Sequence, residues 1–151
     1  MGRARASVLV PGRAAEAEAL WYDPTRWPSW VDGFGHIVKL EGEWPEVGAR
    51  LLWASPPGGR GMVEERVVAY EIRAGQTVEV EDETFRGRQR VTFTPRPEDV
   101  EVTLTLEYEI KDRNPLTPAV DLLFVRRAMT DALRRTLSRF SNVRKAEIQF
   151  G

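Results

Sequence analysis

The chain has 151 residues, no cysteine and a net charge of -1. This length favours one domain with its own core, and the missing cysteines exclude disulfide bonds, thiolate nucleophiles and cysteine metal sites. The balanced charge argues against bulk electrostatic binding of DNA, and no apolar run reaches the length of a signal peptide or a membrane span. We therefore expect a single domain over residues 1–151 that is soluble and cytoplasmic, with no transmembrane segment.

The first part of the chain predicts a strand followed by two short helices. Residues 4–10 can form the strand, and the alanine-rich segment 13–21 favours the first helix. Asp23 can cap the second helix, with Pro24 at its first position. Pro28 is then expected to end this helix almost at once.

Six more strands are expected, separated by short turn segments. The strongest break between them is Pro56-Pro57-Gly58-Gly59. Because the connections are short, neighbouring strands are expected to pair as antiparallel hairpins. The predicted strands are 37–40, 49–54, 62–72, 77–82, 87–94 and 100–111.

The last predicted strand and the helix after it have the most regular patterns in the chain. In 100–111 the even-numbered residues are apolar and the odd-numbered ones are Glu, Thr or Lys, which indicates a strand with one buried face. The chain breaks at 114–118 (Asn-Pro-Leu-Thr-Pro) and restarts as a long helix with an apolar stripe at i, i+3, i+4 spacing. The stripe consists of Leu122, Val125, Met129, Leu133, Thr136 and Phe140.

This order of elements predicts an α+β fold in which the long helix covers a seven-stranded antiparallel sheet. Such a sheet curls, so the helix is expected to lie in its concave face. One helix across a curved sheet can leave a gap, and gaps of this kind become ligand pockets. Val102, Leu104, Leu106 and Tyr108 are expected to form one wall, and Val125, Met129 and Leu133 the opposite wall.

Four features carry a resemblance to a known family: the element order with its arginine-rich last helix, the segment 23–30 (DPTRWPSW), Val47-Gly48 and the segment 85–88 (FRGR). With them the chain resembles the START-like (SRPBCC) helix-grip superfamily over roughly residues 6–143, and in particular its polyketide cyclase/dehydrase and lipid-transport branch. The resemblance implies a sheet that grips the C-terminal helix around a deep, mostly apolar cavity. Members bind lipids, polyketides, hormones or quinones, and some cyclise or hydrolyse what they bind.

Few side chains suggest chemistry. His36 is the only histidine, so a metal site is not expected, although a lone histidine can still transfer protons. The chain has no serine nucleophile motif and no phosphate loop, and we predict no cofactor. Arg66 could orient a polar ligand group if it pointed inward with Glu64, but the sequence leaves the faces of Arg66 and Arg90 open. The candidate catalytic groups are His36, Arg66, Tyr70 and Tyr108.

The aromatic residues are the main candidates for ligand contact. Five tryptophans can plug the end of the sheet where the short helices pack, because aromatic side chains bury large areas. Alternatively, Trp30 and Phe34 can form a lip over the cavity mouth, and both interpretations can hold together. The residues predicted to bind a ligand are Trp30, Phe34, Trp53, Met62, Tyr70, Phe93, Leu104, Leu106, Tyr108, Val125, Met129 and Leu133.

Basic residues cluster in the last helix and tail. They either form a solvated helix face in which Asp131 pairs with neighbouring arginines, or they dock on an anionic surface. The cluster consists of Arg126, Arg127, Arg134, Arg135, Arg139, Arg144 and Lys145.

Three functions fit these features. The favoured one is a binding or carrier module for a small hydrophobic ligand, such as a lipid or polyketide, in the cavity between sheet and helix. The second is a polyketide cyclase or dehydratase that folds a flexible chain into a reactive conformation, and the third is an interaction protein that uses the basic helix. The sequence leaves open the ligand, any catalysis, and whether the protein is a monomer or a homodimer.

Overall fold

The computed structural model describes residues 1–111 and 119–150, so the predicted break at 114–118 lies outside the described residues. Within them, the element order agrees with the prediction. The elements are β1 (Gly2–Pro11), α1 (Ala14–Trp21), the 3-10 helix η1 (Pro24–Ser29), β2 (His36–Glu41), β3 (Arg50–Ala54), β4 (Met62–Glu71), β5 (Gly75–Glu81), β6 (Phe85–Pro95), β7 (Asp99–Ile110) and α2 (Ala119–Phe150).

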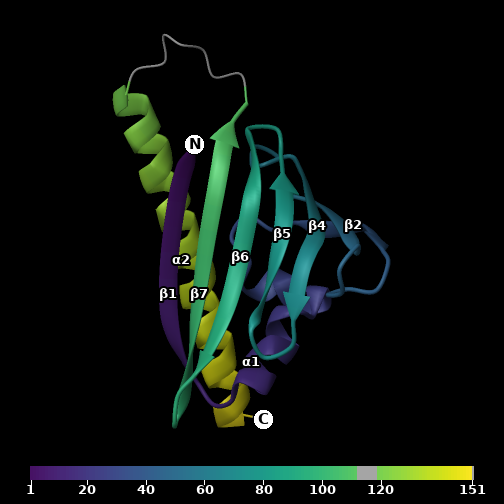
Figure 1. Ribbon diagram of the computed structural model, residues 1–151, viewed down its shortest axis with the longest axis vertical. Helices are drawn as coiled ribbons and strands as arrows, with labels where there is room; N and C mark the ends of the chain where they lie inside the picture. The colour runs from purple at the N-terminus through teal and green to yellow at the C-terminus, as the bar shows by residue number, and fades with distance from the viewer. Residues whose placement is uncertain (112–118, 151) are drawn as a thin grey trace.

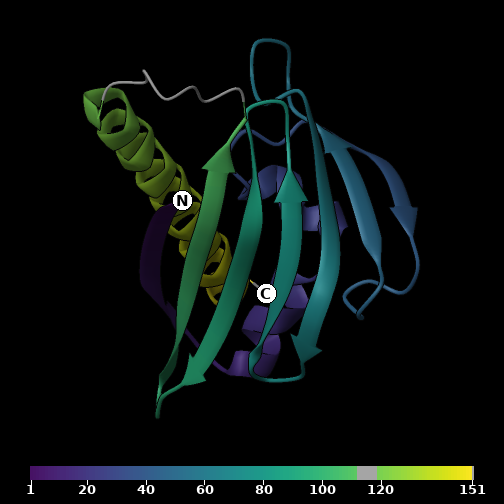
Figure 2. The same cartoon turned by 45° about the horizontal axis from the view of Figure 1, so that its top comes forward.

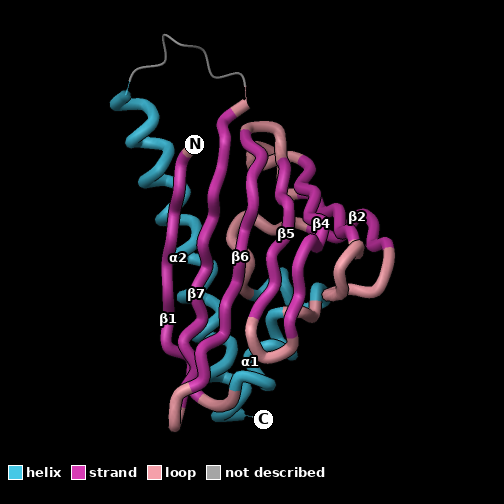
Figure 3. The backbone as a smooth tube through the Cα atoms, viewed as in Figure 1, coloured by secondary structure: helices cyan, strands magenta, loops and turns pink. Residues whose placement is uncertain are grey.

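The seven strands form one antiparallel sheet in the order β1-β7-β6-β5-β4-β3-β2 (Figure 1, Figure 3). Strands β2 to β7 pair as a meander because short turns join them. Strand β1 instead pairs with β7, so that Val8 lies opposite Val102. The helices α1, η1 and α2 all lie on the same side of the sheet (Figure 2), which confirms the predicted α+β helix-grip architecture.

The alternation in β7 and the stripe on α2 meet at the core between them. The even-numbered residues of β7 from Val100 to Tyr108 are buried, as predicted. On its other face Thr103 is buried too, and its hydroxyl hydrogen-bonds with that of Ser7 at 2.8 Å. On α2, the stripe members Leu133 and Phe140 are buried, so these two periodic patterns join the last strand to the last helix.

The short helix η1 departs from the prediction at its end. Asp23 caps it, since the Thr25 backbone N–H donates to the Asp23 carboxylate at 3.1 Å. Pro28, however, lies inside the helix rather than ending it. A 3-10 helix bonds each N–H to the carbonyl three residues back, so it avoids the clash with the fourth carbonyl that a proline causes in an α-helix.

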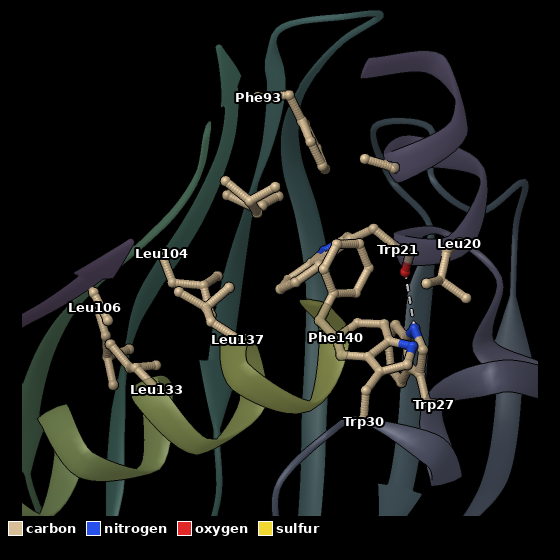
Figure 4. Close-up of a cluster of buried hydrophobic side chains, with 14 of the residues drawn as sticks. Leu20, Trp21, Trp27, Trp30, Phe93, Leu104, Leu106, Leu133, Leu137 and Phe140 are labelled. Carbon is tan, nitrogen blue, oxygen red and sulfur yellow. Dashed lines mark hydrogen bonds between the residues drawn. The ribbon is translucent and has the colours of Figure 1, made fainter. Parts of the chain in front are cut away.

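An aromatic cluster joins α1, η1 and α2 at one end of the sheet (Figure 4). The Trp21 and Trp30 rings lie 4.5 Å apart between centroids, and the Phe140 ring packs edge-on against both at 5.1 Å. The Trp27 indole N–H donates to the Trp21 carbonyl at 2.9 Å. Three of the five tryptophans, Trp21, Trp27 and Trp30, therefore pack together where the short helices meet α2.

Helix α2 is long, but it is not apolar enough for a membrane span. Across residues 1–111 and 119–150, no helix combines the length and the apolarity needed to cross a membrane.

Candidate functional site

A cavity of about 390 Å³ lies between α2 and the inner face of the sheet. This volume falls within the usual range of small-molecule sites. Valines and leucines of β5, β6 and β7 form its sheet wall, and all five tryptophans border it. Its helix wall consists of Phe124, Val125, Ala128, Met129, Ala132, Leu133 and Thr136.

The rim of the cavity contains exposed residues, so the cavity opens to solvent. Phe124 borders it with 75% of its surface exposed. Asp32, also at the cavity, holds α2 in place: its backbone N–H donates to the Thr136 hydroxyl at 2.9 Å, and its carboxylate accepts from Arg135 at 3.1 Å. The loop after η1 and the helix wall are therefore fastened to each other at the cavity.

The first polar group on the cavity wall is Glu65, in the middle of β4. It shares a face with Val63 and Val67, which are both buried. Its carboxylate accepts a hydrogen bond from the Trp53 indole N–H at 2.7 Å. Burial raises the pKa of the Glu65 carboxyl above its usual range, although the Trp53 hydrogen bond and the charge of Arg60 each lower it.

The second polar group is an ion pair between Arg60 and Asp82. Arg60 Nε donates to Asp82 Oδ2 at 2.9 Å, and the buried Asp82 also accepts from the backbone N–H groups of Thr84 and Phe85. The guanidinium carbon of Arg60 lies 5.2 Å from the Trp53 ring centroid and 5.3 Å from that of Phe85. Hydrogen bonding and cation–π contact together hold this arginine in the cavity wall.

Seven of the residues predicted to contact a ligand border the cavity. They come from the position just after η1, from the sheet and from α2, so residues distant in sequence are brought to one space. These are Trp30, Trp53, Leu104, Leu106, Val125, Met129 and Leu133. Trp30 is buried within the aromatic cluster, so it closes the inner end of the cavity instead of forming a lip.

Five other predicted contacts lie outside the cavity. Phe34 packs against Trp53 at 5.0 Å between ring centroids and is not at the mouth. Met62 is exposed at the start of β4, and Phe93 is taken up by edge-on packing against Trp21 and Tyr22. The full set outside the cavity is Phe34, Met62, Tyr70, Phe93 and Tyr108, and the expected wall residue Val102 lies outside as well.

Both candidate tyrosines face other parts of the core. A β-bulge between Val67 and Ala69 shifts the alternation of β4, so Tyr70 packs against a small separate cluster that includes Val67 and Val78. Tyr108 is buried against Phe85, with 6.3 Å between the ring centroids. Neither hydroxyl is therefore available to a ligand in the cavity.

The two remaining catalytic candidates are on the surface. His36 is exposed at the first position of β2. Arg66 is exposed on the outer face of β4, where it pairs with Glu79 at 2.7 Å, and Arg90 is exposed as well. The four candidates His36, Arg66, Tyr70 and Tyr108 thus do not converge on one place.

The polar residues at the cavity were missed by the sequence reasoning. Glu65 gave a usable signal, because it stands midway between Val63 and Val67 in a period-2 pattern. Asp82 gave one as well, because it continues the alternation of Val78 and Val80 at the end of the predicted strand 77–82, whereas Arg60 lies outside the strands and carries no periodicity. Among the described residues, no group of three or more His, Asp or Glu side chains is placed to hold a metal ion.

We expected the basic residues of α2 to face outward, but not all of them do. Arg144 is only 4% exposed and lies 3.5 Å from carboxylate oxygens of Glu16 and Glu147. It faces α1, so its charge is neutralised by ion pairs within the fold. Arg139 pairs with Asp32, and Arg134 with Asp131 at 3.7 Å, which leaves the exposed basic face partly neutralised.

The sheet, the gripping helix and the cavity between them define the helix-grip class of proteins. Residues 1–143 match the family described as polyketide cyclase / dehydrase and lipid transport, and the chain belongs to this family. Among proteins with curated descriptions, none matches this sequence.

Solved structures share the fold at low sequence identity. DynU16, a putative protein in the dynemicin biosynthetic locus, is 17% identical with a TM-score of 0.67; 94% of this chain is covered, but it spans only 46% of DynU16. A protein of unknown function from Staphylococcus aureus, SA2116, is 9% identical with a TM-score of 0.77, covering 97% of this chain and 95% of that one.

An enzyme also appears among the similar structures. Norcoclaurine synthase from Thalictrum flavum, in complex with dopamine and hydroxybenzaldehyde, is 15% identical with a TM-score of 0.66, covering 93% of this chain and 84% of that one. At such identities the similarity concerns the fold alone.

Proposed function

We propose that this protein binds a small, mostly apolar molecule in the cavity between α2 and the sheet. The observation that carries the proposal is a space of about 390 Å³ with apolar side chains on both walls, which the side chains of the protein leave unfilled. Cores normally pack to the density of organic crystals, so an open space of this size favours a binding role. The family description, with its polyketides and lipids, and the small aromatic molecules bound by norcoclaurine synthase support the same class of ligand.

The alternative of a cyclase or dehydratase receives no support from the groups first considered for it. His36, Arg66, Tyr70 and Tyr108 do not border the cavity, so none of them can touch a molecule bound there. The third hypothesis, docking through the basic helix, is weakened because Arg144 is buried and Arg139 is paired.

A titration with an environment-sensitive apolar dye tests the proposed binding. Because all five tryptophans border the cavity, energy transfer from tryptophan to a bound dye reports occupancy. We expect saturable transfer that lipids or aromatic polyketides reverse by competition. Met129→Glu, which places a charge on the apolar wall, should abolish binding.

The matched control is Leu123→Glu, because Leu123 is exposed on the same helix and does not border the cavity. It should bind the dye as the wild type does. The proposal fails if the wild type shows no saturable transfer, or if both variants lose it equally.

A further inference from the structure

Three carboxylates border the cavity, and two of them are paired with cations. Asp82 pairs with Arg60, and Asp32 pairs with Arg135 and Arg139. Glu65 has only the Trp53 indole as a polar partner. Within residues 1–111 and 119–150, Glu65 is thus the one carboxyl bordering the cavity that has no cation within ion-pair distance.

The uncompensated carboxyl has one oxygen available. Trp53 occupies Oε2, whereas Oε1 has no hydrogen-bond partner among the residues that the structure describes. Glu65 itself borders the cavity, so a bound molecule can reach this oxygen. An ionised carboxylate removed from water is costly unless a cation pairs with it.

The aromatic surroundings also favour a cation. Indole rings attract cations to their faces, and Arg60 already lies over the rings of Trp53 and Phe85. Further tryptophans line the same space, among them Trp27 and Trp44. A positively charged group beside Glu65 would therefore meet a carboxylate and aromatic rings together.

We propose that Glu65 binds the ammonium group of an amphiphilic amine, whose apolar part lies between the leucines of β7 and the helix wall. This proposal rests on the proposed function and names its ligand class. A carboxylate ligand would place a second carboxyl group beside Glu65. A neutral alcohol can hydrogen-bond with the protonated Glu65 but forms no ion pair with it.

Binding of such an amine is expected to depend on pH. Because burial raises the pKa of Glu65, its carboxyl keeps its proton to a higher pH than an exposed glutamate does, and below that pKa an incoming ammonium displaces the proton. The other charged groups at the cavity are Asp32, Arg60 and Asp82, while α2 contributes no titratable side chain to its wall. Below the pKa of Glu65, affinity should rise about tenfold for each unit of increasing pH. Above that pKa, affinity should level off.

Three probes with the same apolar chain test the proposal: decylammonium, decanol and decanoate. Their dissociation constants are measured by tryptophan fluorescence, and proton release is measured by calorimetry in buffers of different ionisation enthalpy. We expect decylammonium to bind most tightly and decanoate least tightly. Decylammonium should release a proton at low pH, while decanol should not.

The test variant is Glu65→Gln, which keeps an oxygen for the Trp53 N–H. It should weaken decylammonium binding by about tenfold or more, the usual range for a charged hydrogen bond, and leave decanol binding unchanged. The control is Glu64→Gln, because the neighbouring Glu64 pairs with Arg50 on the opposite face of β4. It should change neither.

The outcomes separate the two proposals. If the wild type binds decanol as tightly as decylammonium and releases no proton, the amine site is refuted while the cavity remains a binding site. If none of the three probes binds, both proposals fail. The selectivity and proton release of the wild type decide the question even if Glu65→Gln does not fold.

Discussion

Replacing Ala132 by leucine tests whether the cavity is a real, unfilled space. Ala132 lies on the helix wall of the cavity, and leucine adds three carbon atoms that can enter the space. At about 0.8 kcal/mol per buried carbon, the free energy of unfolding should rise by up to about 2 kcal/mol. For a chain of this size, the midpoint of thermal unfolding should rise by about 4–8 °C. The same variant should bind apolar dyes more weakly, because the added side chain occupies their space.

The control for this variant is Ala146→Leu. Ala146 is exposed on the same helix and does not border the cavity, so stability should change by less than about 0.5 kcal/mol. Calorimetry and dye titration on both variants provide the comparison. A loss of about 1–3 kcal/mol in Ala132→Leu would indicate overpacking. Unchanged dye binding in that variant would likewise refute the reasoning.

Three further substitutions test other contacts. Glu65→Gln should be as stable as the wild type in acid and more stable as the pH rises. The pKa of Glu65 is higher in the folded protein than in the unfolded chain, so its stabilising contribution is full below the unfolded-state pKa and is lost as the pH rises through the native pKa. Urea unfolding across pH checks this, and a pH-independent difference in stability contradicts it. Glu18→Ala should lower the free energy of unfolding by about 1–3 kcal/mol in urea. The buried Glu18 accepts hydrogen bonds from the Arg73 backbone N–H at 2.6 Å and from the Arg73 guanidinium. A smaller loss would mean that this contact is dispensable. Leu137→Ala should lose about 2–5 kcal/mol in the same assay, because Leu137 is buried in the core, whereas Leu123→Ala on the exposed face should be nearly neutral.

The fold could be predicted from the sequence because its main contacts leave periodic patterns. In β7, one-sided burial requires alternate apolar residues, and in α2 contact with one sheet requires an i, i+3, i+4 stripe. The predicted strands 37–40 and 49–54 correspond to His36–Glu41 and Arg50–Ala54 in the structure. Periodicity does not predict which distant segments pair with each other. The position of β1 beside β7 therefore had no local signal.

The site was harder to predict than the fold because it depends on which face each residue of β4 takes. In 62–72, apolar residues occupy both alternation sets, and the bulge between Val67 and Ala69 changes the face within the strand. Arg66 was therefore considered as a polar group of the cavity, whereas the adjacent Glu65 is the residue that borders it. Arg60 reaches the cavity from outside the strands, where no periodic pattern assigns a direction.

Native mass spectrometry of the protein purified from its own host tests the proposed binding most directly. We predict that the wild type carries a small molecule whose added mass disappears under denaturing conditions. Ala132→Leu, with its cavity partly filled, should carry less of it, whereas Ala146→Leu should match the wild type. A wild-type protein that shows only the mass of the bare chain, and that takes up no lipid, polyketide or amine when these are added, would contradict the account.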